Sequence, residues 1–296
     1  MITDMDQRGQ IQEFLVSRRA RISPQAAGLP VSGRKRRVPG LRREEVAALA
    51  GLSIDYYIRL ERGGLTNASD EVLQAIAGAL RLDTAERAHL VDLARAAKPS
   101  ASRTPHAAAP TVIAPQLQAV LDALVGVPAV ARGRTLDLIA TNPLGRALYS
   151  VVYDSAVDDS VRHAGAPGTP NAARFTFLDP DAQRFWPDWA ETAEDLTAHL
   201  RATAGADPAD GALTELVDEL STGSAVFREL WARHDVRAHG RGVKRFRHPV
   251  AGVLELRYDH LRPAAEPGLT IITYTAEPGT PSQDGLLLLA SVAARN

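Results

Sequence analysis

Residues 41–64 read Leu-Arg-Arg-Glu-Glu-Val-Ala-Ala-Leu-Ala-Gly-Leu-Ser-Ile-Asp-Tyr-Tyr-Ile-Arg-Leu-Glu-Arg-Gly-Gly, and this stretch predicts two short helices joined by a tight turn. Val46, Leu49 and Ala50 recur at spacings of three and four residues, which indicates one apolar face of a first helix. Gly51 follows at once and supplies the backbone freedom that a tight turn needs.

A second helix is expected to begin after Ser53, whose hydroxyl is a good N-cap. Tyr57 and Leu60 give it an apolar face, and the glycines at 63–64 end it. An ordinary helical hairpin has similar parts. The unbroken order of helix, glycine turn, cap and short helix favours a helix-turn-helix, in which the second helix enters the major groove of DNA.

The early residues of such a second helix face the base edges. Arg59 can bind guanine O6 and N7 with two hydrogen bonds, worth about 1–3 kcal/mol of discrimination. Asp55 could accept from a cytosine amino group or favour the helix dipole, and both readings stay open. Ile54 either touches a thymine methyl group or packs. The candidate DNA-binding residues on this helix are Ser53, Ile54, Asp55, Tyr56 (to a phosphate) and Arg59.

Basic residues ahead of this helix are candidates for phosphate contacts, which position a protein without reading sequence. Arg42 and Arg43 open the first helix of the pair. A loop carries the run Arg34, Lys35, Arg36 and Arg37, which either reaches phosphates or the minor groove or is a solvated basic loop. By contrast, Tyr57 is expected in the core, and Glu61 is expected to pair with an arginine of its own domain.

The bulk composition is that of an ordinary globular chain of about two domains, with 296 residues, 45% hydrophobic and 23% charged. No apolar run approaches the roughly 18 residues of a membrane span. The polar N-terminus does not resemble a secretory signal. The absence of cysteine excludes disulfides, thiolate zinc sites and a cysteine nucleophile, and it fits a reducing cytoplasm.

Charge and proline content suggest how the chain divides. Residues 1–62 hold 12 Lys/Arg against 7 Asp/Glu, whereas residues 101–296 hold 18 against 23. Four prolines among small residues at 97–116 are typical of a linker. We therefore expect a multidomain protein, with an all-α five-helix domain over 1–97, a linker over 98–114 and an α+β domain over 115–296.

The expected elements follow from periodicity and caps. In the first domain, helices are predicted at 8–21, around the central pair, after Ser69 or Asp70, and after a capping box at 83–86. Residues 151–169 show no clean period, and 283–290 favours a closing helix over a buried strand. The remaining predictions are helices at 115–125, 143–149, 171–177, 188–204, 208–220 and 222–233, and strands at 129–131, 135–141, 243–247, 252–260 and 269–275.

These residues resemble the XRE-type helix-turn-helix regulators, and over about 10–291 the chain resembles actinobacterial regulators with an MmyB-like ligand-binding domain. In the first half the resemblance rests on Val-Pro-Gly-Leu-Arg-Arg-Glu-Glu-Val-Ala at 38–47 and Asp-Tyr-Tyr-Ile-Arg-Leu-Glu at 55–61. In the second half it rests on Phe-Leu-Asp-Pro at 177–180, Asp-Trp at 188–189, Leu-Trp-Ala-Arg-His-Asp-Val at 230–236, Lys-Arg-Phe at 244–246, His-Pro at 248–249 and Tyr-Thr-Ala-Glu-Pro-Gly at 274–279.

The resemblance implies a transcription factor that acts as a homodimer on double-stranded DNA. It also implies a PAS-like second domain, with an antiparallel sheet flanked by helices, that holds an apolar, fatty-acid-like small molecule as effector. No other cofactor and no membrane partner is implied. Pro187 departs from the pattern, since a proline there would strain a helix.

The second domain shows little sign of catalysis. Its histidines form no metal-binding pattern, and no nucleophile elbow or phosphate-cradling loop occurs. Aromatic residues gather instead, either as plain core or as the wall of a pocket. The candidate ligand-binding residues are Asn142, Arg174, Phe177, Trp189, Trp231, His234 and Phe246. Two alternatives remain, namely an enzyme tethered to DNA and a domain that only dimerises or binds protein.

Overall fold

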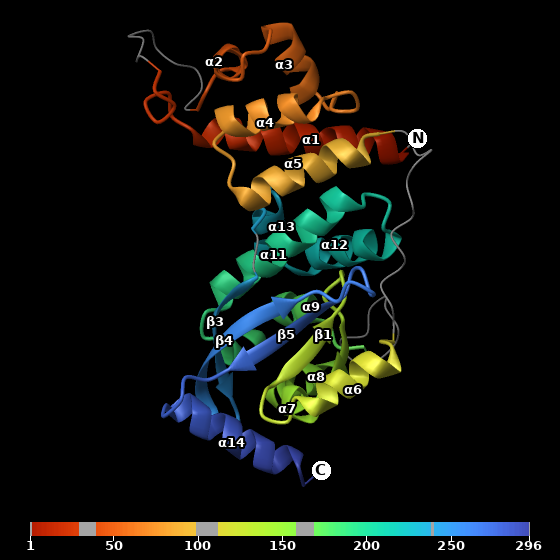
Figure 1. Ribbon diagram of the computed structural model, residues 1–296, viewed down its shortest axis with the longest axis vertical. Helices are drawn as coiled ribbons and strands as arrows, with labels where there is room; N and C mark the ends of the chain where they lie inside the picture. The colour runs from red at the N-terminus through yellow and green to blue at the C-terminus, as the bar shows by residue number, and fades with distance from the viewer. Residues whose placement is uncertain (1, 30–39, 99–111, 158–168, 238–239, 296) are drawn as a thin grey trace. The chain divides into compact units, whose positions relative to one another are not determined.

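The structure is a computed structural model that describes residues 2–29, 40–98, 112–157, 169–237 and 240–295 (Figure 1). The chain forms two compact units. The first comprises the described parts of 1–104, 201–210 and 231–238, and the second those of 105–200, 211–230 and 239–296. The first unit thus includes two segments from beyond the expected linker at 98–114, of which residues 99–111 lie outside the described part. No helix in the described residues is long and apolar enough to cross a membrane.

Five helices from the N-terminal part of the chain form most of the first unit, as expected. Ser53 and Ser69 cap the third and fourth helices through their hydroxyls, and Asp83 with Glu86 forms the predicted capping box of the fifth. The helices are α1 (Ile2–Arg21), α2 (Arg43–Leu49), α3 (Ile54–Glu61), α4 (Asp70–Ala79) and α5 (Thr84–Ala96).

The turn between α2 and α3 is the one that the sequence predicts, with Gly51 at a φ of +66°. Val46 and Ala47 are fully buried, and Ala50 packs against the same core. The expectation that Leu49 faces inward is wrong, because its side chain is 39% exposed. Each residue turns a helix by about 100°, so a face centred between positions 46 and 47 leaves position 49 on its flank.

A buried carboxylate joins the first three helices. Glu61 is fully buried, and it binds the Nε atoms of Arg19 in α1, at 2.7 Å, and of Arg43 in α2. Tyr57, also fully buried, lies with its hydroxyl 3.5 Å from the same carboxylate, and burial raises the pKa of this phenol. Both expectations are therefore confirmed, namely that Tyr57 is core and that Glu61 pairs with arginine.

The two later segments of the first unit contribute to its core. Val236 is 4% exposed and belongs to the same hydrophobic cluster as Ile11, Phe14 and Leu90, and Ala202 packs against that cluster. These residues lie in or beside α11 (Trp189–Ala206), which passes from the second unit into the first after Leu200, and α13 (Ala225–Trp231).

His89 in α5 is buried where α11 comes closest to it. Its ring meets Phe14 edge-to-face, with the ring centroids 4.9 Å apart, and its Nδ1 has no hydrogen-bond partner among the described residues. Burial, together with the nearby charges of Arg201 and Arg18, lowers the pKa of His89 to about 3. Gly205 of α11 faces this ring so closely that a Cβ there would overlap the imidazole.

The second unit is built on a five-stranded antiparallel sheet in the order β2-β1-β5-β4-β3. All five strands were expected, with small differences at their ends. They are β1 (Ala129–Arg132), β2 (Leu138–Thr141), β3 (Arg241–His248), β4 (Gly252–Leu261) and β5 (Thr270–Thr275).

The helices of this unit also agree with expectation except at two places. Within 151–169, α8 (Ser150–Val157) forms at the start, while 158–168 lies outside the described residues; α10 (Ala182–Phe185) was not expected. Pro187 strains no helix, because it lies between the end of α10 and the start of α11. The others are α6 (Pro115–Ala123), α7 (Pro143–Leu148), α9 (Ala172–Leu178), α12 (Gly211–Gly223) and α14 (Pro281–Ala293), the last confirming the predicted closing helix.

The strand register separates the two faces of the sheet. Ala129, Ala131 and Ile271 pack with Leu121 of α6 on one face. The alternate positions of the same strands must lie on the other face, since successive side chains point to opposite sides. Cα pairing places Arg132 opposite Thr270, Tyr274 opposite Tyr258, Lys244 opposite Leu256 and Phe246 opposite Leu254. We call this second face the inner face.

Gly205→Ala tests the close packing of α11 on His89. We expect a loss of about 1–3 kcal/mol in unfolding free energy, because the added methyl group must displace a buried ring. Gly78→Ala in α4 is the matched control, since a Cβ there meets nothing within 4 Å. It should stabilise by up to about 1 kcal/mol. Equal effects of the two substitutions in urea denaturation would contradict the packing described.

Glu61→Gln tests the buried carboxylate. The variant should lose about 3 kcal/mol of unfolding free energy, because two arginines lose the charge that compensates them. Glu44→Gln is the control, since the Glu44 side chain is 57% exposed and pairs with Arg42 at the surface. That control should change stability by less than about 1 kcal/mol. Thermal or urea unfolding measures both changes, and equal losses in the two variants would contradict the role given to Glu61.

His89 predicts an acid-sensitive fold. The unfolded state binds a proton near pH 6.5, whereas the folded pKa is about 3, so the unfolded state holds more protons between these values. Stability therefore falls as pH drops through this window, by about 2 kcal/mol from this residue at pH 5. Urea unfolding at pH 7 and pH 5 should show a smaller drop for His89→Phe than for the parent. An equal drop in both would refute it.

Candidate functional site

The outward face of α3 carries the side chains expected to meet DNA. Ile54 is 49% exposed, and Asp55 and Arg59 are exposed beside it. Tyr56 is half-buried, with the Arg59 guanidinium 4.9 Å from the centre of its ring. Ser53 is exposed, and its hydroxyl accepts from the Tyr56 backbone N–H at 3.2 Å. The structure thus brings these five predicted residues together at the start and on one side of a short helix.

The basic residues ahead of α3 are in different situations. Arg43 is bound to the buried Glu61, which already engages its charge, although its side chain is 42% exposed. Arg42 lies at the surface, and its Nη1 is 3.2 Å from Glu44. The run Arg34, Lys35, Arg36 and Arg37 lies outside the described residues. The assignment of all these residues to DNA stays a prediction.

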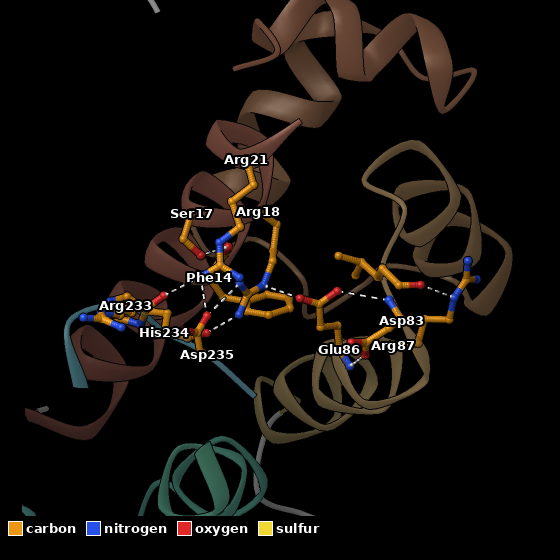
Figure 2. A network of polar contacts seen from close by, with 11 residues as sticks. Phe14, Ser17, Arg18, Arg21, Asp83, Glu86, Arg87, Arg233, His234 and Asp235 are labelled. Atoms are coloured by element: carbon orange, nitrogen blue, oxygen red, sulfur yellow. Dashed lines mark hydrogen bonds and ion pairs between the residues drawn. The ribbon is translucent and has the colours of Figure 1, made fainter. Parts of the chain in front are cut away.

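A second polar network lies in the first unit, also at the C-terminal end of α1 (Figure 2). Arg18 is 3% exposed, and its Nε is 3.0 Å from a carboxylate oxygen of Glu86. Its Nη1 is 3.4 Å from Asp235, and its Nη2 donates to the backbone carbonyl of His234. Burial lowers the pKa of Arg18, while the two carboxylates act in the opposite direction. A buried arginine of α1 is thereby tied to the segment 231–238.

Further contacts hold the same segment. Arg21 binds Asp235 and donates to the carbonyl of Arg233 at 3.2 Å. The Nε2 of His234 is 3.3 Å from Glu13. His234 has a φ of +53°, an uncommon conformation for a residue with a side chain. Contacts on both sides of this backbone turn fix it in place.

Two of the predicted ligand-binding residues have structural roles in the second unit. Asn142 is 1% exposed; its Oδ1 accepts from Ala129 and Gly145, and its Nδ2 donates to Leu124 and Val127. The amide therefore already uses its donors and acceptor. Arg174 binds the carboxylate of Glu219, with its Nη2 at 2.8 Å.

The other predicted ligand residues do not come together. Phe177 packs against Phe227, and the Trp189 indole donates to a carbonyl in α9. Trp231 and His234 belong to the first unit, where Arg201 stacks over the Trp231 ring. Among the predicted set, Phe246 lies on the inner face of the sheet. Their role in ligand binding stays a prediction.

Sequence reasoning missed the polar groups that share the inner face of the sheet with Phe246. Arg132 of β1 and Lys244 of β3 lie on the inner face, together with Tyr258 and Tyr274. Period-two spacing was the available signal, because Lys244 and Phe246 alternate with exposed residues along one strand. The register that brings distant strands together could not be read from the sequence.

The inner face combines aromatic rings with cations. Phe246 contacts Trp186 and Tyr274, with ring centroids 5.3 and 5.4 Å apart. The Lys244 ammonium lies 4.0 Å from the centre of the Trp186 ring, and burial lowers the pKa of this lysine to about 8. The hydroxyls of Tyr149 and Tyr274 hydrogen-bond to each other. A water-poor surface with several donors results.

Over the described ranges no cluster of three or more histidine or acidic residues could hold a metal ion. The adjacent pair His234 and Asp235 contacts Glu13 and the arginines of α1. These contacts account for that pair without a metal.

Comparison with known families agrees with both units. A model of a helix-turn-helix domain matches residues 17–90. A model described as the MmyB-like transcription regulator ligand binding domain matches residues 113–289, which is more than half of the chain. No curated protein matches the chain in a sequence search. With a helix-turn-helix ahead of this ligand-binding domain, the chain belongs to the MmyB-like transcription regulators.

Proposed function

We propose that this DNA-binding transcription regulator reads its operator through the exposed side of α3 and responds to a small apolar effector in its second unit. The proposal that α3 reads the operator is supported by the difference between the buried and the exposed residues of this helix. Tyr57, Leu60 and Glu61 are fully buried, while Ile54 and Arg59 face solvent. A helix that is packed against its own domain on one side and exposes a basic side chain to solvent is suited to binding in a major groove.

Within this face, Arg59 is the proposed reader of guanine, and Arg42 is the proposed contact to a phosphate. The stacking of Arg59 on Tyr56 restricts the guanidinium before it meets a base. Arg43 supports the interface indirectly, because it compensates Glu61 at the base of α3.

Arg59→Ala should relax base preference at one operator position, with a loss of about 1–3 kcal/mol against the preferred sequence and little against others. Arg42→Ala should instead weaken binding to all sequences alike and reduce the salt dependence by about one counterion. Selection from a random duplex library, followed by gel shifts at several salt concentrations, measures both effects.

Each variant serves as the control for the other, because both remove one positive charge and only Arg59 is proposed to contact a base. If Arg59→Ala kept the base preference of the parent, or if the parent ignored duplexes at low salt, base reading by α3 would be refuted.

For the second unit we propose a PAS-like sensor of an apolar, fatty-acid-like molecule, in a homodimeric regulator. The antiparallel sheet with helices against it and the aromatic inner face support this reading. The competing reading is a module that only dimerises. Native mass spectrometry of the purified protein separates them: a retained small molecule supports sensing, and a dimer without one supports the alternative.

The segments 201–210 and 231–238 are the proposed route from sensor to DNA-binding helices. Each is part of the first unit and is joined covalently at both ends to stretches of the second. A ligand shifts a regulator only if it binds two states with different affinity. A change of the second unit would then act on α1 through the contacts of Arg18 with Asp235 and with the His234 carbonyl.

A further inference from the structure

We propose that the inner face of the sheet is an anion-binding site in which Arg132, assisted by Lys244, receives the carboxylate of an otherwise apolar effector. This inference rests on the proposed sensing function of the second unit and goes further, because it names the residues of this chain that would bind the charged group of the effector.

The site is assembled from separate strands. Arg132 ends β1, which pairs with β5, and Lys244 lies in β3, the third strand from β1 along the sheet. The register puts Tyr274 and Tyr258 between them, directly paired across β5 and β4. Because paired residues point to the same side of a sheet, all four side chains face the same space.

Arg132 carries a charge that its surroundings do not balance. The residue is 8% exposed, and its buried Nε has no hydrogen-bond partner within the described residues. The groups that act on it electrostatically are the phenols of Tyr149, Tyr274 and Tyr258 and a second cation, Arg262. Burial raises the pKa of each phenol, so they remain neutral at pH 7. A buried and uncompensated arginine is costly unless an anion completes the site.

Lys244 differs because acidic groups act on it. Asp195 and Glu191 of α11 raise the pKa of its ammonium, against the larger effects of burial and of Arg132. The lysine is therefore partly balanced, while the arginine is not. With Arg262 counted, three cations stand against two carboxylates, which leaves one net positive charge. One net positive charge favours a singly charged anion, which points to a carboxylate rather than to a phosphate dianion.

The surroundings of the two cations are apolar and suit a hydrocarbon body. Trp186 and Phe246 are 1% and 0% exposed, and Ile272 of β5 lies opposite Val130 on the inner face. The Trp186 Nε1 is buried without a partner among the described residues, which leaves one further donor near Lys244. Apolar walls with a few placed polar groups are the usual composition of a small-molecule site.

Isothermal titration calorimetry on the full-length protein tests the proposal with three probes that share a ten-carbon chain: decanoate, decanol and decyl phosphate. Native mass spectrometry first establishes that the sample carries no bound molecule. Decanoate should bind at least about 10-fold more tightly than decanol, because only the carboxylate forms charge-assisted hydrogen bonds. It should also bind more tightly than decyl phosphate.

Arg132→Met should weaken decanoate binding by about 10- to 100-fold and leave decanol binding unchanged. It should also raise the melting temperature of the ligand-free protein, because a buried uncompensated charge is removed. A merely structural arginine would give the opposite shift. The matched control is Arg146→Met in α7, whose exposed guanidinium lies 3.8 Å from the centre of the Tyr153 ring. That variant should keep the preference for decanoate.

Lys244→Met gives a second measure that leaves Arg132 in place, with an expected loss of about 3- to 10-fold in decanoate affinity. Equal affinity for decanoate and decanol in the parent overturns the anion site but leaves apolar sensing intact. Tighter binding of decyl phosphate overturns the choice of a carboxylate. A lower melting temperature of ligand-free Arg132→Met would refute the statement that the charge of Arg132 is uncompensated. If none of the probes binds, the sensing function is contradicted as well.

Discussion

The compensated burial of the Glu61 carboxylate is the interaction on which the first unit depends. A fully buried carboxylate is tolerated only when cations and donors replace its water, and here Arg19 and Arg43 come from two other helices to do so. Any rotation of α3 about its axis would separate the carboxylate from one of them. Glu61 thus determines which side of α3 faces solvent, and a groove-reading helix needs that fixed orientation.

Buried arginines in the two units have different surroundings. In the first, Arg18 and Glu61 are each matched by oppositely charged side chains from other elements. In the second, Arg132 is buried among neutral phenols. Paired charges stabilise one arrangement of the elements that carry them. An unpaired buried charge destabilises the ligand-free protein, and an anionic ligand removes this cost when it binds. The contrast agrees with the proposal that an anionic effector binds in the second unit.

Local signals in the sequence predicted local structure well. The caps at Ser53, Ser69 and Asp83, the turn at Gly51 and all five strands were found, because each depends on neighbours in the chain. The ligand candidates were chosen by residue type alone, and Asn142 proved to be committed to backbone groups. Arg132 was missed because its significance arises from register across three other strands, which no short stretch encodes.

The interleaved segments make the DNA-binding unit an unusual kind of module. Val236 lies in its core and Asp235 completes the surroundings of Arg18, yet both follow residues 105–200 and 211–230 of the second unit in the chain. A ribosome that has made only the first hundred residues has not yet supplied these parts. The core of the unit is therefore completed late in synthesis. Recombination at the linker would transfer the N-terminal helices without these later segments. Regulators of this design are expected to diversify by gradual substitution within both halves rather than by exchange of cassettes.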